Sequence, residues 1–296
     1  MEQPLPRVPL IDAHIHLYDP SAVPYGWMAA QWPELNRPQL ESDFDRAHCP
    51  IAVEGYFACE AHPDDGHHAS EASFLSQRAA RDRRLLAITA LARVERGAAV
   101  ARDLDDLAPF SLVRGIRVGL AGRPDRMAEP LFVEGVRTVG RRGLHYEIAV
   151  QHTGLSHALM LARACPDVSM ILDHIGMPDI KAGIWQPWCA LMADLARHPN
   201  VAVKISGAMA GAGRGSGAQQ VSPFVRHAID CFGFDRSMFA SDWPALTRTG
   251  HGYADWITVV EVALAGATGA ERRQLYRDTA KRLFRLGATV SEKDLA

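Results

Sequence analysis

Two histidines separated by one residue, His14 and His16, are the clearest chemical signal in the chain. They lie in residues 10–16, Leu-Ile-Asp-Ala-His-Ile-His, a mostly apolar run that predicts a buried strand. Because successive side chains of a strand point to opposite faces, both imidazoles should point to the same side. Such a pair suits a divalent metal such as zinc, or a polarised carbonyl group, if other strands bring further ligands and a base. Alternatively, the two rings simply pack and hydrogen-bond within the core.

A histidine and an aspartate follow two later apolar runs, and both are candidates for the same site. His174 follows the run at residues 170–172, and Asp242 follows the run at residues 238–240. Asp242 could bind a metal and deprotonate water, or it could cap a helix, since helix starts favour such residues. His174 could point into an active site, or it could be a hydrogen-bonded structural histidine. The neighbouring Asp173 should point to the opposite side from His174.

The elements that must position these groups are short apolar runs, rich in β-forming residues, that alternate with helical patterns. The alternation predicts an α/β fold with parallel strands, and eight runs are the number that closes a (β/α)8 TIM barrel. A doubly wound open sheet is the alternative. We expect one domain over residues 1–296. The predicted strands are residues 10–16, 51–57, 85–91, 112–118, 144–151, 168–174, 201–206 and 237–241.

A barrel would bring the ends of its strands together, because active sites of this fold lie where the strands end and the following loops begin. The last strand of a closed barrel lies beside the first, so Asp242 should reach the two histidines. The candidate residues at these ends are His14, His16, Arg117, Gln151, His174, Lys204 and Asp242.

Two cations within apolar strands, Arg117 and Lys204, need anionic partners, because an unpaired buried charge is costly. Carboxylates of the barrel or oxygens of a substrate could serve. Gln151 shares the inward register of the fifth strand, but an amide is a poor zinc ligand. Glu60 and His62 could contribute ligands instead, or they could belong to a solvated loop.

Two loops and one helix complete the prediction. Residues 17–50 are rich in aromatic residues and prolines and predict a folded cover over the barrel mouth, with Tyr18, Tyr25, Trp27 and Trp32 as candidate specificity residues. The glycine-rich residues 207–217 predict a mobile lid. Residues 271–286 predict an amphipathic helix that closes the barrel.

The composition favours a small-molecule substrate. The chain has 32 basic and 34 acidic residues, so it lacks the overall positive charge that nucleic acids or anionic membranes attract. Its five cysteines form no Cys-x-x-Cys pair and predict reduced thiols. With no apolar signal region and no membrane-spanning run, we expect a cytoplasmic protein, which could form a homo-oligomer.

Six motifs spread over nearly the whole chain carry a family resemblance. They are Ile11-Asp-Ala-His-Ile-His16, Tyr25-Gly-Trp27, Gly115-Ile-Arg117, Asp173-His-Ile-Gly-Met-Pro178, Asn200-Val-Ala-Val-Lys-Ile-Ser-Gly207 and Phe239-Ala-Ser-Asp-Trp-Pro244. Together they resemble the amidohydrolase superfamily, in particular the lactonase group of the amidohydrolase family 2 branch. That group includes L-fuconolactonase, L-rhamnonolactonase, 2-pyrone-4,6-dicarboxylate lactonase and galactarolactone isomerase.

The resemblance implies a distorted barrel that acts on lactones. It places His14, His16, His174 and Asp242 in the polar centre of the site, where they would be both the catalytic residues and the ligands of any metal. It also places substrate oxygens near Arg117 and Lys204, with Gln151, Tyr25 and Trp27 as further candidate substrate contacts. Gln151 stands where the wider superfamily has a histidine, and some lactonases of this branch work without metal. The resemblance therefore leaves a bound zinc ion open.

The leading hypothesis is a hydrolase that opens a sugar-acid lactone or a related carboxylated lactone, a step of carbohydrate-acid catabolism. Asp242 would take a proton from water, and the histidines, a cation or a bound metal would stabilise the oxyanion. A metal-dependent decarboxylase and a lactone isomerase are the enzymatic alternatives. A barrel that serves only as a binding module is the non-enzymatic one.

Overall fold

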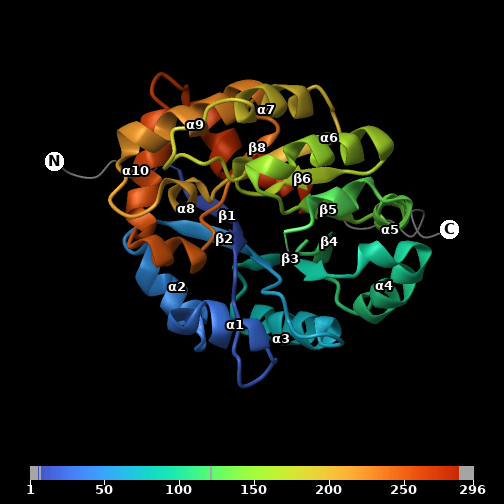
Figure 1. Cartoon of the computed structure of the whole chain (residues 1–296). Helices are drawn as coiled ribbons and strands as arrows, with labels where there is room; N and C mark the ends of the chain where they lie inside the picture. Colours follow the sequence, from blue (N-terminus) through green and yellow to red (C-terminus); the bar gives the residue numbers. More distant parts are fainter. Residues whose placement is uncertain (1–5, 7, 121, 287–296) are drawn as a thin grey trace.

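A computed structural model of the chain describes residues 6, 8–120 and 122–286. Eight parallel strands form one sheet, in which each strand pairs with the next along the chain. Figure 1 shows the strands at the centre and the helices around them. The strands are β1 (Leu10–Ile15), β2 (Val53–Cys59), β3 (Leu85–Leu91), β4 (Val113–Arg117), β5 (His145–Ile148), β6 (Met170–Leu172), β7 (Val201–Ile205) and β8 (Ser237–Phe239). The prediction of a TIM barrel is confirmed.

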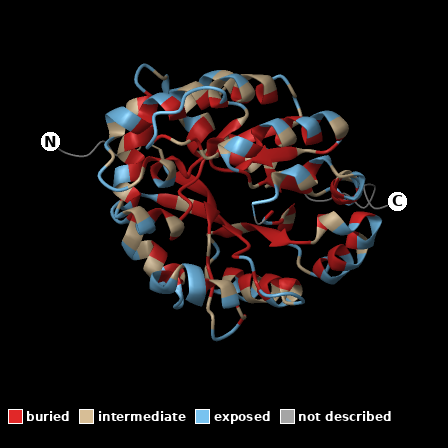
Figure 2. Ribbon diagram, viewed as in Figure 1, coloured by how far each residue is buried: buried red, intermediate tan, exposed pale blue. Residues whose placement is uncertain are grey.

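Helices form the outer layer, and their buried faces pack against the strands while their outer faces meet solvent (Figure 2). They are α1 (Gly26–Gln31), α2 (Glu41–His48), α3 (His68–Arg81), α4 (Ala101–Leu107), α5 (Pro130–Arg141), α6 (Leu155–Ala164), α7 (Trp188–Ala196), α8 (Ala208–Ala212), α9 (Ala218–Phe232), α10 (Tyr253–Ala263), α11 (Gly269–Arg273) and α12 (Thr279–Leu283). A π-helical turn, Gln274–Asp278, joins the last two. Within the described part of the chain, we find no helix with both the length and the apolar character needed to span a membrane.

The barrel closes between β1 and the segment that follows β8. Ile15 forms a parallel bridge with Trp243, and the backbone N–H of Asp242 donates to the carbonyl of His14 at 2.9 Å. The buried carboxylate of Asp12 accepts a hydrogen bond from the backbone N–H of Ser241 at 2.9 Å. These contacts hold Asp242 beside the two histidines of β1.

A register shift in β1 directs the histidines into the barrel. Ile11 and Ala13 belong to the apolar cluster inside the barrel, whereas Ile15 packs in the outer layer. The pairing of β1 with β2 shifts between Asp12 and Ile15, which is the geometry of a β-bulge. Because the bulge resets the alternation, His14 follows the inward-facing Ala13 and still points inward.

The C-terminal helices close the far end of the barrel, as predicted. Ala280 and Phe284 join the interior apolar cluster, and the ring of Phe284 lies 4.1 Å from that of Phe57 on β2. This end is filled by apolar side chains, so the open mouth and its polar groups lie at the carboxyl ends of the strands.

The long connection between β1 and β2 folds over the mouth, which confirms the predicted cover. It contains α1, the 3₁₀ turn Pro33–Leu35 and α2. The glycine-rich residues 207–217 contain α8. Movement of that segment remains a prediction.

Candidate active site

Three imidazoles and one carboxylate meet at the barrel mouth. His14 Nε2 lies 3.1 Å from His16 Nε2, and Asp242 Oδ1 lies 3.7 Å from the former and 3.4 Å from the latter. His174 Nε2 lies 3.9 Å from the same oxygen of Asp242. We call these four residues the histidine–aspartate cluster. They come from the ends of β1, β6 and β8, so residues remote in sequence converge as predicted.

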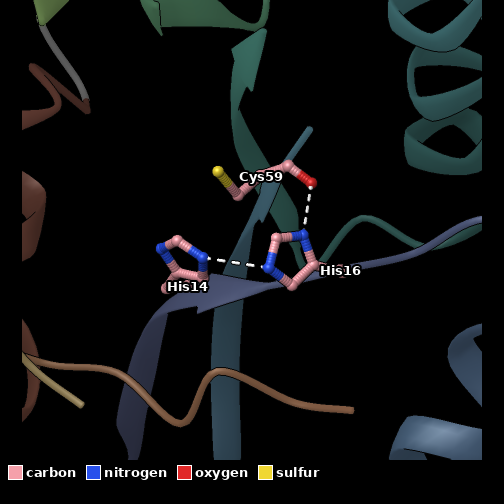
Figure 3. Close-up of side chains that lie close together, drawn as sticks. All are labelled: His14, His16 and Cys59. Atoms are coloured by element: carbon pink, nitrogen blue, oxygen red, sulfur yellow. Dashed lines mark hydrogen bonds between the residues drawn. The ribbon is translucent and has the colours of Figure 1, made fainter. Parts of the chain in front are cut away.

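The Nδ1 atoms of the three histidines form hydrogen bonds with residues outside the cluster. His16 Nδ1 lies 3.1 Å from the carbonyl oxygen of Cys59, which can only accept, so His16 donates there and keeps an unprotonated Nε2 (Figure 3). Lys204 Nζ lies 2.9 Å from His14 Nδ1. Since an ammonium can only donate, His14 accepts at Nδ1 and carries its proton on Nε2, facing His16. His174 Nδ1 is fixed by the hydroxyl of Ser206 at 2.8 Å.

A buried ion network lies directly beneath the cluster. Lys204 is fully buried, and its ammonium lies 2.6 Å from Glu147 and 3.2 Å from Asp173. Arg117 Nη1 lies 3.4 Å from the second oxygen of Asp173, and Arg117 Nε donates to Glu60 at 2.6 Å. We call these five residues the ion network. Two cations thus face three carboxylates within it.

The position of Asp173 corrects the sequence prediction that it points away from His174. Strand β6 ends at Leu172, and His174 and the following residue have left-handed backbone angles, with φ of 56° and 48°. The alternation of a strand no longer applies in this turn. Asp173 and His174 therefore both point into the barrel.

The network and the cluster tune each other's ionisation. Burial alone would raise the pKa of Asp242, but His174, His16 and His14 together hold it below its ordinary value. Burial and the charge of Lys204 lower the pKa of His14 to about 3. At neutral pH the cluster therefore combines an ionised carboxylate, which can accept a proton, with a neutral His14.

His16, His174 and Asp242 of the cluster form part of the floor of a cavity of about 590 Å³, whereas His14 is fully buried and does not line it. Helix α1 and the 3₁₀ turn after it supply one wall, with Trp27, Met28, Trp32 and Leu35. The loops after β2, β4, β5, β6 and β8 supply most of the rest. The lining residues are His16, Tyr18, Trp27, Met28, Gln31, Trp32, Leu35, Glu60, Ala61, His62, Arg117, Gly119, Leu120, Gly122, Arg123, Pro124, Ala149, Val150, Gln151, Thr153, Gly154, His174, Met177, Asp242, Pro244 and Ala245.

The structure divides the predicted substrate contacts into two groups. Arg117, Gln151 and Trp27 line the cavity. Lys204 does not, because it lies fully buried in the ion network. The hydroxyl of the buried Tyr25 donates to Glu71 at 2.9 Å, behind the wall. These two residues can support the site but do not face a ligand in the cavity.

The chain matches the amidohydrolase family 2 model, described as amidohydrolase, over residues 11–286. The chain belongs to the amidohydrolase 2 family. The L-fucono-1,5-lactonase of Burkholderia ambifaria is 31% identical over 175 residues, which are 58% of this chain and 60% of that relative. The y4mH protein of Sinorhizobium fredii is 32% identical over 193 residues, 62% of this chain and 64% of that one. Each match thus spans less than two thirds of the relative's length.

A solved structure is similar over nearly the full length of this amidohydrolase. It is the crystal structure of an amidohydrolase from Burkholderia multivorans with bound zinc, which is 26% identical. The alignment has a TM-score of 0.80 and covers 94% of this chain and 99% of that chain.

The histidine–aspartate cluster of this amidohydrolase fits a divalent metal ion. Zinc binds imidazole nitrogens at about 2.0–2.1 Å, so tetrahedral ligand atoms are about 3.3–3.4 Å apart. The separation of His14 from His16 and those of Asp242 from the three histidines, 3.1–3.9 Å, bracket that spacing. One ligand atom each from His14, His174 and Asp242 lies within 4.8 Å of the others, so these three residues could hold the ion together. For His14 to bind through Nε2, its proton must move to Nδ1. A buried acceptor is at hand, since Asp173 Oδ1, which also faces the Lys204 ammonium at 3.2 Å, lies 3.6 Å from His14 Nδ1.

Several supporting residues were missed or misjudged from the sequence of this amidohydrolase. The sequence leaves Glu60 either in a metal site or in a solvated loop, whereas in the structure it is only 1% exposed and binds Arg117. Its neighbour His62 has a half-exposed side chain. Glu147 received no role, although an acidic residue in the apolar strand β5 is the same signal that pointed to Arg117 and Lys204.

Glu71 gives this amidohydrolase a testable pH dependence. Burial and the charge of Glu60 raise the pKa of Glu71 to about 8. A carboxyl with a raised pKa takes up a proton on folding, so the stability of the protein should fall as pH rises from about 4.5 to about 8. Glu71→Gln keeps an oxygen that accepts from Tyr25 and should flatten this decline.

We therefore expect the stability advantage of Glu71→Gln over the wild type to grow by about 2 kcal/mol or more between pH 5 and pH 8. Urea unfolding of both proteins at each pH measures this difference in the free energy of unfolding. The matched change Glu134→Gln, on the exposed face of α5, should leave the slope as in the wild type. Parallel curves for Glu71→Gln and wild type would contradict the assignment.

Proposed function

We propose that this amidohydrolase hydrolyses a lactone. The observation that carries the proposal is the carboxylate of Asp242, 3.4–3.9 Å from three imidazole nitrogens on the floor of a cavity large enough for a small ring. The relative from Burkholderia ambifaria is named a lactonase, which supports the same reaction class.

Asp242 is the base in this mechanism. Its lowered pKa keeps it ionised, and it lines the cavity, where it can accept a proton from a water molecule. The hydroxide formed attacks the lactone carbonyl. Once protonated, Asp242 returns the proton to the ring oxygen as the carbon–oxygen bond breaks, which yields a hydroxy acid.

Donors on the cavity floor stabilise the oxyanion that forms on the carbonyl oxygen. Arg117 lines the cavity and has N–H groups beyond those that bind Glu60 and Asp173. The histidines add dipoles on the floor, where the buried side chains of His14 and His174 are largely removed from water and such interactions are stronger. A divalent ion held by the cluster would polarise the carbonyl and lower the pKa of bound water.

We expect purified protein to contain about one divalent metal ion per chain. Elemental analysis measures the content before and after dialysis against a chelator. The double variant His16→Ala, His174→Ala should bring it close to zero. The exposed His62→Ala is the matched control and should retain the ion. Equal metal content in both variants would place the ion outside the cluster.

The reaction is tested by an acid-release assay with a pH indicator over a panel of δ- and γ-lactones, with and without chelator. Ring opening with one acid released per turnover supports the proposal. Release of carbon dioxide from carboxylated substrates would indicate a decarboxylase. A rearranged lactone without acid release would indicate an isomerase.

A further inference from the structure

We propose that the cavity selects uncharged lactones with an apolar substituent, in preference to carboxylated or polyhydroxylated lactones. This inference rests on the proposed lactone hydrolysis and adds the chemical class of its substrate. Two independent features of the cavity carry it: the charge balance of the floor and the composition of one wall.

Among the residues that the structure describes, the floor has no surplus positive charge with which to bind a substrate carboxylate. The cations Arg117 and Lys204 face the carboxylates of Glu60, Glu147 and Asp173, and Asp242 adds a fourth negative charge. The formal charge of this region is therefore minus two, which a bound divalent metal would only neutralise. An anionic lactone would meet repulsion or no net attraction.

Arg117 cannot act as a free carboxylate receptor, although it lines the cavity. Its Nε and one Nη bind the side chain and the backbone carbonyl of Glu60 at 2.6 and 2.9 Å, and its other Nη faces Asp173. The N–H groups left over suit a neutral carbonyl oxygen. Among the described lining residues, the other arginine is Arg123, which is exposed and paired with Asp125 at 2.7 Å.

The wall formed by α1 and the following turn is apolar. Trp27 and Trp32 pack edge to face with ring centroids 4.9 Å apart, and Met28 and Leu35 lie beside them in the lining. The indole N–H of Trp27 already donates to the carbonyls of Ala61 and His62, at 3.1 and 2.9 Å. We call Trp27, Met28, Trp32 and Leu35 the aromatic wall.

The aromatic wall is held in place from outside. The guanidinium of Arg248 lies 4.1 Å from the ring centroid of Trp32, and the same group donates to Glu34 at 2.9 Å. The wall is thus braced against the loop after β8. A braced apolar surface gains free energy when it buries an alkyl or aryl group.

Polar side chains that could bind several hydroxyl groups are placed at the mouth. Gln31, Gln151 and Thr153 line the cavity but are exposed to solvent. A lactone with a hydroxyl on each ring carbon would turn some of its hydroxyl groups toward the aromatic wall. There these hydroxyl groups would lose their hydrogen bonds to water without gaining partners from the protein. The inner cavity therefore favours a ring with an apolar substituent.

The charge component is tested with a matched pair, a 2-pyrone carboxylate and its methyl ester, in the acid-release assay. We expect kcat/KM for the ester to exceed that for the acid by about tenfold or more. Glu60→Gln frees the charge of Arg117 and should reduce this ratio by about tenfold. A wild-type preference for the acid would overturn the proposal.

The wall component is tested with three δ-lactones: one bearing a butyl chain, unsubstituted δ-valerolactone, and glucono-1,5-lactone. We expect kcat/KM to be about tenfold higher for the butyl compound than for either of the others. Trp27→Ala should remove most of this advantage, so that the ratio of kcat/KM between the butyl compound and δ-valerolactone approaches one. The matched control Trp185→Ala removes a partly exposed tryptophan outside the cavity and should leave the ratios unchanged.

The outcomes separate this inference from the proposed function. If lactones are opened but glucono-1,5-lactone or the pyrone acid is preferred, the inference fails and lactone hydrolysis stands. If no lactone in either set is opened, the proposed function itself fails. If Trp27→Ala lowers turnover of all three δ-lactones equally, the wall has no role in selection.

Discussion

Replacing Asp242 by Asn should lower kcat for lactone opening by about 10³-fold, because an amide cannot take the proton from water. The oxygen of the amide still accepts hydrogen bonds, so the fold should persist. Steady-state kinetics with a lactone that the wild type opens measures the effect, and the thermal unfolding midpoint reports the fold. Metal content measured on the same samples shows whether a bound ion was lost as well.

The matched control is Asp230→Asn on the exposed face of α9, where the carboxylate pairs with Arg226 at 2.8 Å. It should retain wild-type kcat. If Asp242→Asn also kept kcat within about threefold, Asp242 would not be the base. Lost activity together with a lost fold would point to a structural role, and Asp242→Glu would then test whether a carboxylate alone restores turnover.

Replacing Lys204 by Met should destabilise the protein by about 3–5 kcal/mol. Lys204 is fully buried, and its removal takes away the cation that the carboxylates of Glu147 and Asp173 share, although Arg117 still faces Asp173 at 3.4 Å. Burial opposes ionisation of Asp173, and Lys204 is the main group that holds its pKa below the ordinary value. The free energy of unfolding in urea measures the loss.

Lys281→Met is the matched control for this change, because Lys281 pairs with Glu54 near the surface. It should cost about 1 kcal/mol or less. Adding Glu147→Gln to Lys204→Met should recover part of the lost stability, since one uncompensated charge disappears. Equal losses for Lys204→Met and Lys281→Met would show that the buried ammonium is not balancing the network.

Local sequence patterns were sufficient to predict the barrel and the positions of the cluster. Each strand is marked by its own apolar run, and the amphipathic segment that ends at Phe284 is visible without any tertiary information. Once the fold class is known, closure of the barrel places Asp242 beside His14, because the first and last strands must be neighbours. This step depends on topology and not on side-chain detail.

The role of each buried charge could be decided only by the tertiary structure. Whether Arg117 and Lys204 bind a substrate or a carboxylate depends on which residues of other strands face them, and their partners Glu60, Glu147 and Asp173 come from three separate strand ends. Strand alternation also predicted the wrong direction for Asp173, because a left-handed turn follows β6.

The amino-acid sequence by itself therefore determined the number of strands, the residues at their ends and the family. The tertiary structure decided which cations are already neutralised and which side chains line the cavity. The physical reason is that apolar periodicity is a local property of the chain, whereas the energy of a buried charge depends on all groups within a few ångströms, most of which are distant in sequence.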